Sequence, residues 1–164
     1  EYLHTVKLKE QPDLHIVHRD LKPTHILLED ENRVVVADFF QAKITNTFVT
    51  QTGRTQSRVN GDIYYSSPER LMGQKVDSRT DLYSAGAIIY EMVTGKAPFG
   101  GDNDDFIQMA KRIVKEPVKL PSEFDEEYAC WDEWLSRALA KDRNQRFRTA
   151  NEMLAALPDE KNSK

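Results

Sequence analysis

The sequence predicts a mainly α-helical fold with one short β-hairpin. Residues 80–93 (TDLYSAGAIIYEMV) are apolar almost all round, which is typical of a helix buried inside a globular domain. Three later segments, residues 104–115, 126–139 and 150–157, carry apolar side chains at mostly helical spacing. Strand signals are confined to one place, where two apolar runs flank a polar turn. We therefore expect a domain built around helices.

The predicted hairpin comes first along the chain. Its strands are Ile26-Leu27-Leu28 and Val34-Val35-Val36-Ala37, and the polar stretch Glu29-Asp30-Glu31-Asn32 provides the turn. Residues 41–61 follow, rich in Thr, Ser, Gln, Arg and Asn and without periodicity. A loop of that length is usually functional or disordered.

The buried helix at residues 80–93 is about a dozen residues long, which is too short to cross a membrane. Gly95 is expected to stop it, because glycine commonly follows the last helical residue. Pro98-Phe99 then lies in a loop. In the helix predicted for residues 104–115, the apolar positions are Phe106, Ile107, Met109, Ala110, Ile113 and Val114.

Two further helices are predicted after a loop bounded by Pro117 and Pro121. Residues 126–139 place one apolar face on a helix, formed by Tyr128, Trp131, Trp134, Leu135 and Ala138. For residues 150–157, Thr149 is a good N-cap, and Glu152 three residues later would complete a capping box. Residues 158–164 are expected to be a frayed polar tail.

Composition indicates one intracellular domain of 164 residues. The net charge of -4 and the isoelectric point near 5.6 argue against nucleic acid as an obligatory partner. The single cysteine, Cys130, cannot form an internal disulfide and is expected to be a buried free thiol. No signal peptide or membrane-spanning run is found, so we expect a cytoplasmic protein with no membrane partner.

The run His18-Arg19-Asp20-Leu21-Lys22-Pro23-Thr24-His25 is the most informative part of the chain. Phosphoryl transfer requires positioning and charge stabilisation. The carboxylate of Asp20 can accept or orient the proton of a hydroxyl group, and Lys22 can neutralise charge on a transferred phosphoryl group. An isolated Arg-Asp pair would instead indicate a solvated turn between two strands. The whole run, however, resembles the protein kinase catalytic loop H-R-D-L-x-x-x-N at every position except the last.

Four further motifs resemble the same family and follow in its order. Asp38-Phe39-Phe40 stands in the place of D-F-G, and Ser67-Pro68-Glu69 in the place of A-P-E, so residues 41–61 resemble an activation loop. Asp81 begins a D-x-x-S-x-G pattern. Residues 141–146 (KDRNQR) resemble K-D-P-x-x-R, with Arg143 in the proline position.

The resemblance implies a role for each matching residue. Asp20 would be the catalytic base, and Lys22 would be an electrostatic stabiliser close to the cofactor. The Lys at position 22 also makes the loop more similar to that of serine/threonine kinases than to that of tyrosine kinases. Asp38 would bind Mg²⁺, with position 25 supplying a second metal ligand next to ATP. The structural residues implied by the family are His18, Asp81, which braces the catalytic loop, and the pair formed by Glu69 and Arg146.

Three departures from the family pattern bear on this chemistry. His25 stands where the family has a metal-binding Asn, and imidazole suits Mg²⁺ poorly. Phe40 replaces a Gly whose backbone is free to adopt positive φ. Asp62 occupies a position where a Thr is usual, and its carboxylate could pair with Lys22. Together the departures favour a weakened active site.

The resemblance covers residues 1–157, which we expect to form a kinase C-terminal lobe without the N-terminal lobe. Residues 1–5 (EYLHT) resemble the end of the helix before the catalytic loop, and residues 6–15 are expected to be an exposed insertion. Neither a G-x-G-x-x-G loop nor a V-A-I-K-like strand occurs in the chain. The resemblance then implies a serine/threonine kinase domain, using Mg²⁺ and ATP, that is inactive or weak as this chain alone.

Two alternatives remain open at this point: a non-catalytic, pseudokinase-type interaction module, and a fragment of a larger active kinase. The expected partners are a protein substrate or docking protein, and a separate or upstream N-lobe. The surface that an N-lobe would cover includes apolar residues around Leu3, Leu27, Leu28 and Phe39. We therefore expect the chain to self-associate, to bind a partner through this surface, or to rearrange its activation loop over it.

Overall fold

The structure is a computed structural model that describes residues 2–5, 15–29, 33–45, 62–100 and 105–158. Within these residues helices predominate, and the strands form two small antiparallel sheets of two strands each. The predicted mainly α fold is therefore confirmed. Most of the expected insertion at residues 6–15 and most of the loop at residues 41–61 lie outside the described residues, and His15 begins a strand.

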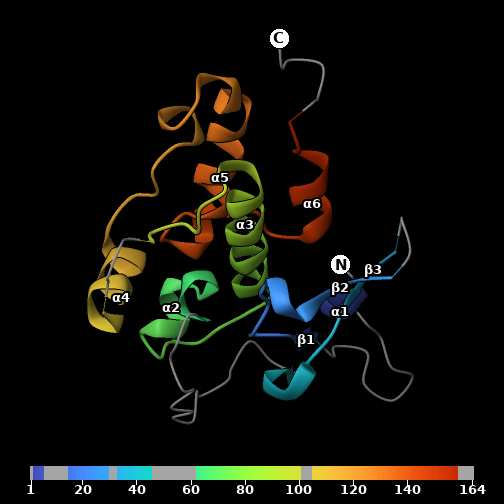
Figure 1. The fold of residues 1–164 in the computed structure, drawn as a ribbon. Coiled ribbons are helices and arrows are strands. Elements are labelled where there is room, and N and C mark those ends of the chain that lie inside the picture. The colour runs from blue at the N-terminus through green and yellow to red at the C-terminus, as the bar shows by residue number, and fades with distance from the viewer. Residues whose placement is uncertain (1, 6–14, 30–32, 46–61, 101–104, 159–164) are drawn as a thin grey trace.

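Helix α3 (Arg79–Thr94) runs through the middle of the domain, with the other helices around it (Figure 1). The carboxylate of Asp77 accepts from the amide of Arg79 at 2.9 Å, which satisfies a donor that the first turn leaves open. At the other end Gly95 takes a left-handed conformation, with φ of 69°, and its amide donates to the Glu91 carbonyl at 2.8 Å. The predicted stop at Gly95 is thus confirmed.

Four shorter helices surround α3: α2 (Pro68–Leu71), α4 (Phe106–Lys115), α5 (Asp132–Ala138) and α6 (Ala150–Ala155). Helix α4 starts where Asp105 accepts from the amide of Gln108 at 2.8 Å, and it buries Met109 and Ile113 on the face predicted from its periodicity. Figure 1 shows α4 and α6 on opposite sides of α3.

The prediction of one continuous helix over residues 126–139 is wrong. Residues Glu126–Trp131 form a 3₁₀ helix, η5, and α-helical geometry begins only at Asp132. The carboxylate of Asp132 accepts from the amide and hydroxyl of Ser122, which ties the start of α5 to the turn η4 (Pro121–Glu123). A carboxylate in a first helical turn also favours starting a new helix there.

The last helix, α6, begins as predicted at Thr149, whose hydroxyl accepts from the amide of Glu152 at 3.0 Å. The reciprocal half of the predicted capping box is wrong. The Glu152 carboxylate accepts instead from the amide of Arg148 at 2.7 Å and pairs with Arg137. The Arg148 amide and the Arg137 guanidinium thus take the place of the Thr149 amide as partners of this carboxylate. The helix ends at Ala155 rather than at residue 157.

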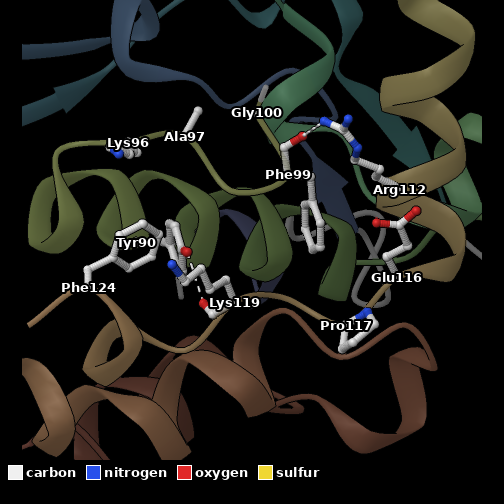
Figure 2. A pocket seen from close by; sticks show the side chains of 10 residues that line it. All are labelled: Tyr90, Lys96, Ala97, Phe99, Gly100, Arg112, Glu116, Pro117, Lys119 and Phe124. Atoms are coloured by element: carbon white, nitrogen blue, oxygen red, sulfur yellow. Dashed lines mark hydrogen bonds between the residues drawn. The ribbon is translucent and has the colours of Figure 1, made fainter. Parts of the chain in front are cut away.

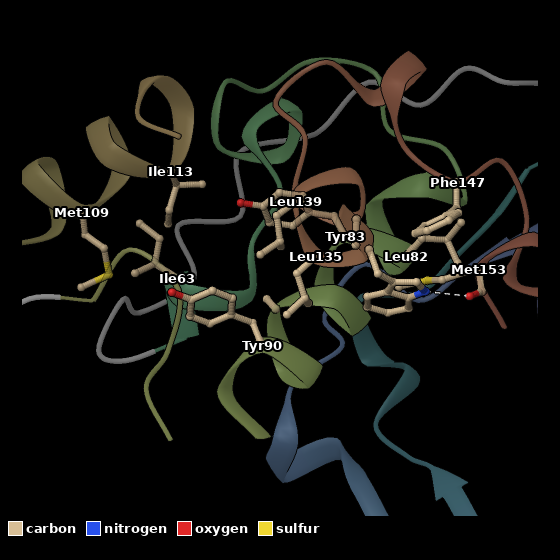
Figure 3. Packing of buried hydrophobic residues seen from close by; sticks show 13 residues of the cluster. Ile63, Leu82, Tyr83, Tyr90, Met109, Ile113, Leu135, Leu139, Phe147 and Met153 are labelled. Carbon is tan, nitrogen blue, oxygen red and sulfur yellow. Dashed lines mark hydrogen bonds between the residues drawn. The ribbon is translucent and has the colours of Figure 1, made fainter. Parts of the chain in front are cut away.

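The core lies where α3, α4, α5 and α6 meet (Figure 3). The indole of Trp134 donates to the carbonyl of Met153 at 3.0 Å, which fastens α6 onto α5. Cys130, expected to be buried, is only partly so, because it belongs to η5 at the edge of the core. The buried cluster consists of Ile63, Leu82, Tyr83, Ala87, Tyr90, Met109, Ile113, Trp134, Leu135, Ala138, Leu139, Phe147 and Met153.

The predicted hairpin is confirmed as β2 (Ile26–Glu29) paired with β3 (Arg33–Val36), with Leu28 opposite Val34. A second pair, β1 (His15–Val17) with β4 (Lys43–Thr45), was not predicted from the sequence. Helix α1 (Tyr2–Thr5) lies against β1. In Figure 1 these N-terminal elements gather at one end of α3. Among the described residues, no helix is long and apolar enough to cross a membrane.

Candidate active site

The segment between β1 and β2 is held in place by Asp81, from the first turn of α3. The two carboxylate oxygens of Asp81 accept from the amides of His18 and Arg19, each at 2.8 Å, and His4 Nε2 lies 3.0 Å from Oδ2. Arg19 has a φ of 69°, which is uncommon for a residue with a side chain. The buried carboxylate therefore fixes the backbone immediately before Asp20, as the family resemblance implies.

The imidazole of His18 joins this segment to the end of β3. It is buried, and its Nε2 donates to the carbonyl of Ala37 at 2.9 Å while its Nδ1 accepts from the amide of Asp20 at 3.3 Å. The ring of Phe39 packs edge-on against the His18 imidazole, with 4.7 Å between the two ring centres. These contacts bring Asp38 next to the loop that carries Asp20, and they agree with the structural role expected of His18.

Asp20 lies among cationic side chains. Its Oδ1 is 3.2 Å from Arg70 Nη2 and its Oδ2 is 3.6 Å from Lys22 Nζ. Asp20 and Lys22 were predicted from the sequence, whereas Arg70, which α2 contributes from 50 residues away, was not. The one available signal was that Arg70 follows the Ser67-Pro68-Glu69 motif directly.

His25 lies between Asp20 and Asp38. Its Nδ1 donates to the backbone carbonyl of Asp20 at 2.8 Å, and its Nε2 is 3.2 Å from Asp38 Oδ2. The other oxygen of Asp38 accepts from the amide of Phe40 at 3.2 Å. The imidazole is nearly buried, whereas half of the Asp38 side chain is exposed.

The predicted difficulty at Phe40 does not arise at that residue. The left-handed conformation falls on Asp38, with φ of 59°, and Phe40 lies within the 3₁₀ turn η2 (Phe39–Gln41). Aspartate visits this conformation more readily than other residues with side chains. The Phe40 ring is 91% exposed instead.

The metal expected from the family resemblance, Mg²⁺, fits these residues only in part. Mg²⁺ prefers oxygen ligands in near-ideal octahedral geometry. The carboxylate of Asp38 can supply an oxygen ligand, whereas the imidazole of His25 supplies only nitrogen. Among the described residues, no group of three or more His, Cys, Asp or Glu side chains is arranged to hold a metal ion. The side chain of Asp62 lies outside the described part of the chain.

The expected pair between Glu69 and Arg146 is present and buried. The guanidinium donates through both terminal nitrogens to the two carboxylate oxygens, each at 2.8 Å, and it donates further to the carbonyls of Ala140 and Lys141. Burial raises the pKa of Glu69, but the hydrogen bonds and charge of Arg146 outweigh it, so the pKa is below its usual value. This bidentate contact links α2 to the segment before α6.

A cavity of about 330 Å³ lies elsewhere, between the C-terminal half of α3, α4 and η4 (Figure 2). The Tyr90 hydroxyl donates to the Lys119 carbonyl at 2.9 Å on its wall, and Lys119 Nζ lies 4.1 Å from the centre of the Phe124 ring. None of the predicted site residues lines this cavity. Its walls are formed by Tyr90, Lys96, Ala97, Phe99, Gly100, Arg112, Glu116, Pro117, Lys119 and Phe124.

Comparison with known proteins identifies one family. The profile of the protein kinase domain matches residues 1–156. The chain is 36% identical over 149 residues to a probable serine/threonine-protein kinase of Clostridium acetobutylicum, and 40% identical over 145 residues to the serine/threonine-protein kinase PknB of Mycobacterium leprae. These alignments cover 90% and 87% of this chain and 22% of each relative. The chain thus spans about a fifth of the length of the curated relatives that it matches.

Proposed function

This chain belongs to the protein kinase domain family, and from that premise we propose that it is the C-terminal lobe of a serine/threonine protein kinase. The reaction of such an enzyme is transfer of the γ-phosphoryl group of ATP to a protein hydroxyl. The observation that carries the proposal is the loop that Asp81 holds by two backbone amides, with Asp20 and Lys22 on it and Asp38 beside it.

In this proposal Asp20 orients the substrate hydroxyl and takes up its proton as the oxygen attacks phosphorus. Lys22, whose ammonium lies 3.6 Å from the same carboxylate, offsets negative charge on the transferred group. Arg70 holds the other oxygen of Asp20, so the carboxylate is oriented before substrate binds. The family generally uses ATP with Mg²⁺, but because His25 does not suit Mg²⁺, we assign no step to a bound magnesium ion here.

We propose further that these 164 residues alone transfer phosphate weakly or not at all. They contain no G-x-G-x-x-G loop and no V-A-I-K-like strand, the parts that cover and pair the ATP phosphates in protein kinases. An N-terminal lobe, from the same protein or from a partner, would complete the nucleotide site.

Two measurements test the proposal. In calorimetry the chain alone is expected to show no Mg-ATP binding at about micromolar affinity, roughly -8 kcal/mol. A chimera that joins the N-terminal lobe of the M. leprae relative to this chain is then assayed for transfer of labelled phosphate to a protein substrate. Transfer that Asp20→Asn abolishes supports the proposal. A folded chimera without transfer contradicts it.

A non-catalytic interaction module is the second candidate, and the imidazole at position 25 together with the exposed ring of Phe40 favours it. The variant His25→Asn separates the two candidates. Increased transfer by the chimera after this substitution would indicate a kinase with a weakened site. The same substitution is not expected to give activity to the chain alone, because the nucleotide site stays incomplete.

A further inference from the structure

We propose that the cavity between α3, α4 and η4 binds a small organic anion with a flat apolar body, of the class of aromatic carboxylates. The carboxylate would lie between Lys96 and Lys119. The apolar body would pack among the rings of Tyr90, Phe99 and Phe124. The cavity shares no residue with the site proposed for phosphoryl transfer, so this inference holds or fails independently of the proposed function.

The first argument is the charge of the cavity walls. The whole chain has a net charge of -4, yet the cavity is lined by three cationic side chains and one carboxylate, that of Glu116. Glu116 lies one helical turn after Arg112, at the end of the cavity away from Phe124 (Figure 2), so an arginine offsets its charge there. Glu123 lies outside the walls, and its carboxylate accepts from the amide of Leu120 at 2.6 Å. Among the described residues that line the cavity, its end near Phe124 therefore has two lysines and no acid.

The second argument is the arrangement of these two lysines. Lys119 Nζ lies 4.1 Å and Lys96 Nζ lies 5.4 Å from the centre of the Phe124 ring, so both ammonium groups gather at one ring. Within the part of the chain that the structure describes, no carboxylate pairs with either of them. Two like charges at one ring repel each other, and an anion between them would replace that repulsion by attraction.

The third argument is the apolar part of the wall. The rings of Tyr90 and Phe124 are inclined at 79°, with 6.4 Å between their centres, and Phe99 and Pro117 add further apolar surface. Tyr90 is only 2% exposed, and its hydroxyl donates to the carbonyl of Lys119 at 2.9 Å. This bond fixes both the aromatic wall and the backbone that carries one of the cations, so the site is ordered before a ligand binds.

The size of the cavity and its two kinds of wall decide the class of ligand. Small-molecule sites are clefts of roughly 300–1,000 Å³, lined mostly by apolar side chains with a few placed polar groups. The volume of about 330 Å³ is at the lower end of that range, which suits a small compound. An inorganic anion would use only the two lysines, and a neutral aromatic compound only the rings. Lys96 and Lys119 are exposed, so a ligand can enter past them.

The test is a titration of the chain with 4-fluorobenzoate, followed by fluorine NMR, beside titrations with the neutral amide 4-fluorobenzamide and with acetate. We expect saturable binding of 4-fluorobenzoate at about millimolar affinity, and weaker binding of both comparison compounds. Lys96→Gln and Lys119→Gln should each lower the affinity for 4-fluorobenzoate by up to about fivefold, the size of an exposed ion pair, and the double variant should lower it further. The affinity for the amide should stay the same in all three variants.

Lys75→Gln is the matched control, because Lys75 is exposed, loses the same charge and does not line the cavity. Its affinity for 4-fluorobenzoate should equal that of the unsubstituted chain. Amide NMR gives a readout that needs no variant: 4-fluorobenzoate should shift the signals of Lys119 and Phe124, and not those of the exposed apolar residues Leu28 and Phe40.

Four results would overturn the inference: no saturable binding at millimolar concentration, equal binding of the amide, unchanged affinity in the double variant, or shifts confined to the exposed apolar residues. Equally tight binding of acetate would also overturn it, since that would indicate an adventitious ion only.

Discussion

Arg146 is the most enclosed charged side chain among the described residues, with 1% of its surface exposed. It gives hydrogen bonds to Glu69, Ala140 and Lys141, and its guanidinium lies 4.7 Å from the centre of the Tyr83 ring. Transferring two charges out of water is costly, and this set of donors and acceptors offsets the cost. The pair therefore depends on both partners being present.

The first prediction is that Arg146→Ala destabilises the protein by about 3–5 kcal/mol, because the Glu69 carboxylate would stay buried without its partner. The matched control is Arg143→Ala. Arg143 is partly exposed and lies 3.7 Å from Asp77, so its loss should cost roughly 1 kcal/mol or less. Urea unfolding of the three proteins gives the comparison. Small and equal losses would show that the buried pair contributes little.

The second prediction concerns Lys141, whose ammonium donates to the carbonyl of Ile113 at 2.7 Å and lies 3.6 Å from the centre of the Phe99 ring. Burial, and secondarily the charge of Arg146, lower the pKa of Lys141 to about 7, against the opposite effect of Glu116. Between pH 7 and 10.5 the unfolded chain then holds a proton that the folded chain has lost. Stability should therefore rise with pH across this window, by at most about 1.4 kcal/mol per pH unit.

Urea unfolding between pH 6 and 10 checks this. In Lys141→Met the contribution should be missing, and also in Lys141→Arg, because a guanidinium keeps its proton throughout. If the pH dependence of both variants parallels that of the unsubstituted protein, the ammonium of Lys141 is stabilised by its carbonyl and ring contacts and does not titrate near 7.

Among the elements, α3 and α5 pack against each other at Gly86. A methyl group at this position would come within 2.8 Å of the Ala138 side chain, so the absence of a side chain is what allows the two helices to approach. Glycine inside a helix is otherwise unfavourable by about 1 kcal/mol relative to alanine. The close approach places the N-terminal turn of α3, and with it Asp81, relative to the core.

The third prediction is that Gly86→Ala destabilises the domain, because overpacking of about 1–3 kcal/mol exceeds the gain in helix propensity. Ala138→Gly alone should also be destabilising. The double variant should be more stable than the sum of the two losses predicts, since removing the Ala138 methyl group gives the new one room. Thermal unfolding of the four proteins decides: additive losses would mean that the two positions do not compete for space.

For the whole molecule, the notable surface is at the end that carries the candidate active site. The most exposed apolar side chains there are Leu28 at 79% and Phe40 at 91%, with Leu27, Val34 and Phe39 also exposed. Leu3, expected to be part of this surface, is half-buried because α1 packs on β1. Exposed apolar surface of this kind is typical of an interaction site.

The fourth prediction is that the chain self-associates through this surface, or binds an N-lobe or docking partner there. Light scattering over a concentration series should show an increase in mean mass that Phe40→Gly and Leu28→Ser reduce. Ile107→Ser, on the outer face of α4 where the side chain is 75% exposed, is the control and should change nothing. A monomer at all concentrations would contradict self-association, and so would an equal effect of the control.

Much of this fold could be predicted because the sequence signals for the helices and the hairpin come from residues that are close together in the chain. Each signal lies within a few neighbouring positions: the apolar run at residues 80–93, the helix stop at Gly95, the helix start at Thr149, and the polar turn between two short apolar runs. The 3₁₀ helix η5 was missed because its apolar residues have the same spacing as an α-helix, and the α-helical start depends on Asp132 bonding to Ser122, a contact between two different elements.

The identity of the site residues was also contained in the chain, since Asp20, Lys22, His25 and Asp38 stand in short runs whose order matches a known family. Their partners were not, because pairing depends on which surfaces meet when α3 brings distant segments together. Arg70 lies beside Asp20, and His25 Nε2 beside Asp38, only because the fold brings separate segments together. The contact of Asp81 with the His18 and Arg19 amides, by contrast, was expected from the family resemblance. Hydrophobic periodicity indicates whether a residue is buried or exposed, whereas the packing of elements against each other determines which atom that residue faces.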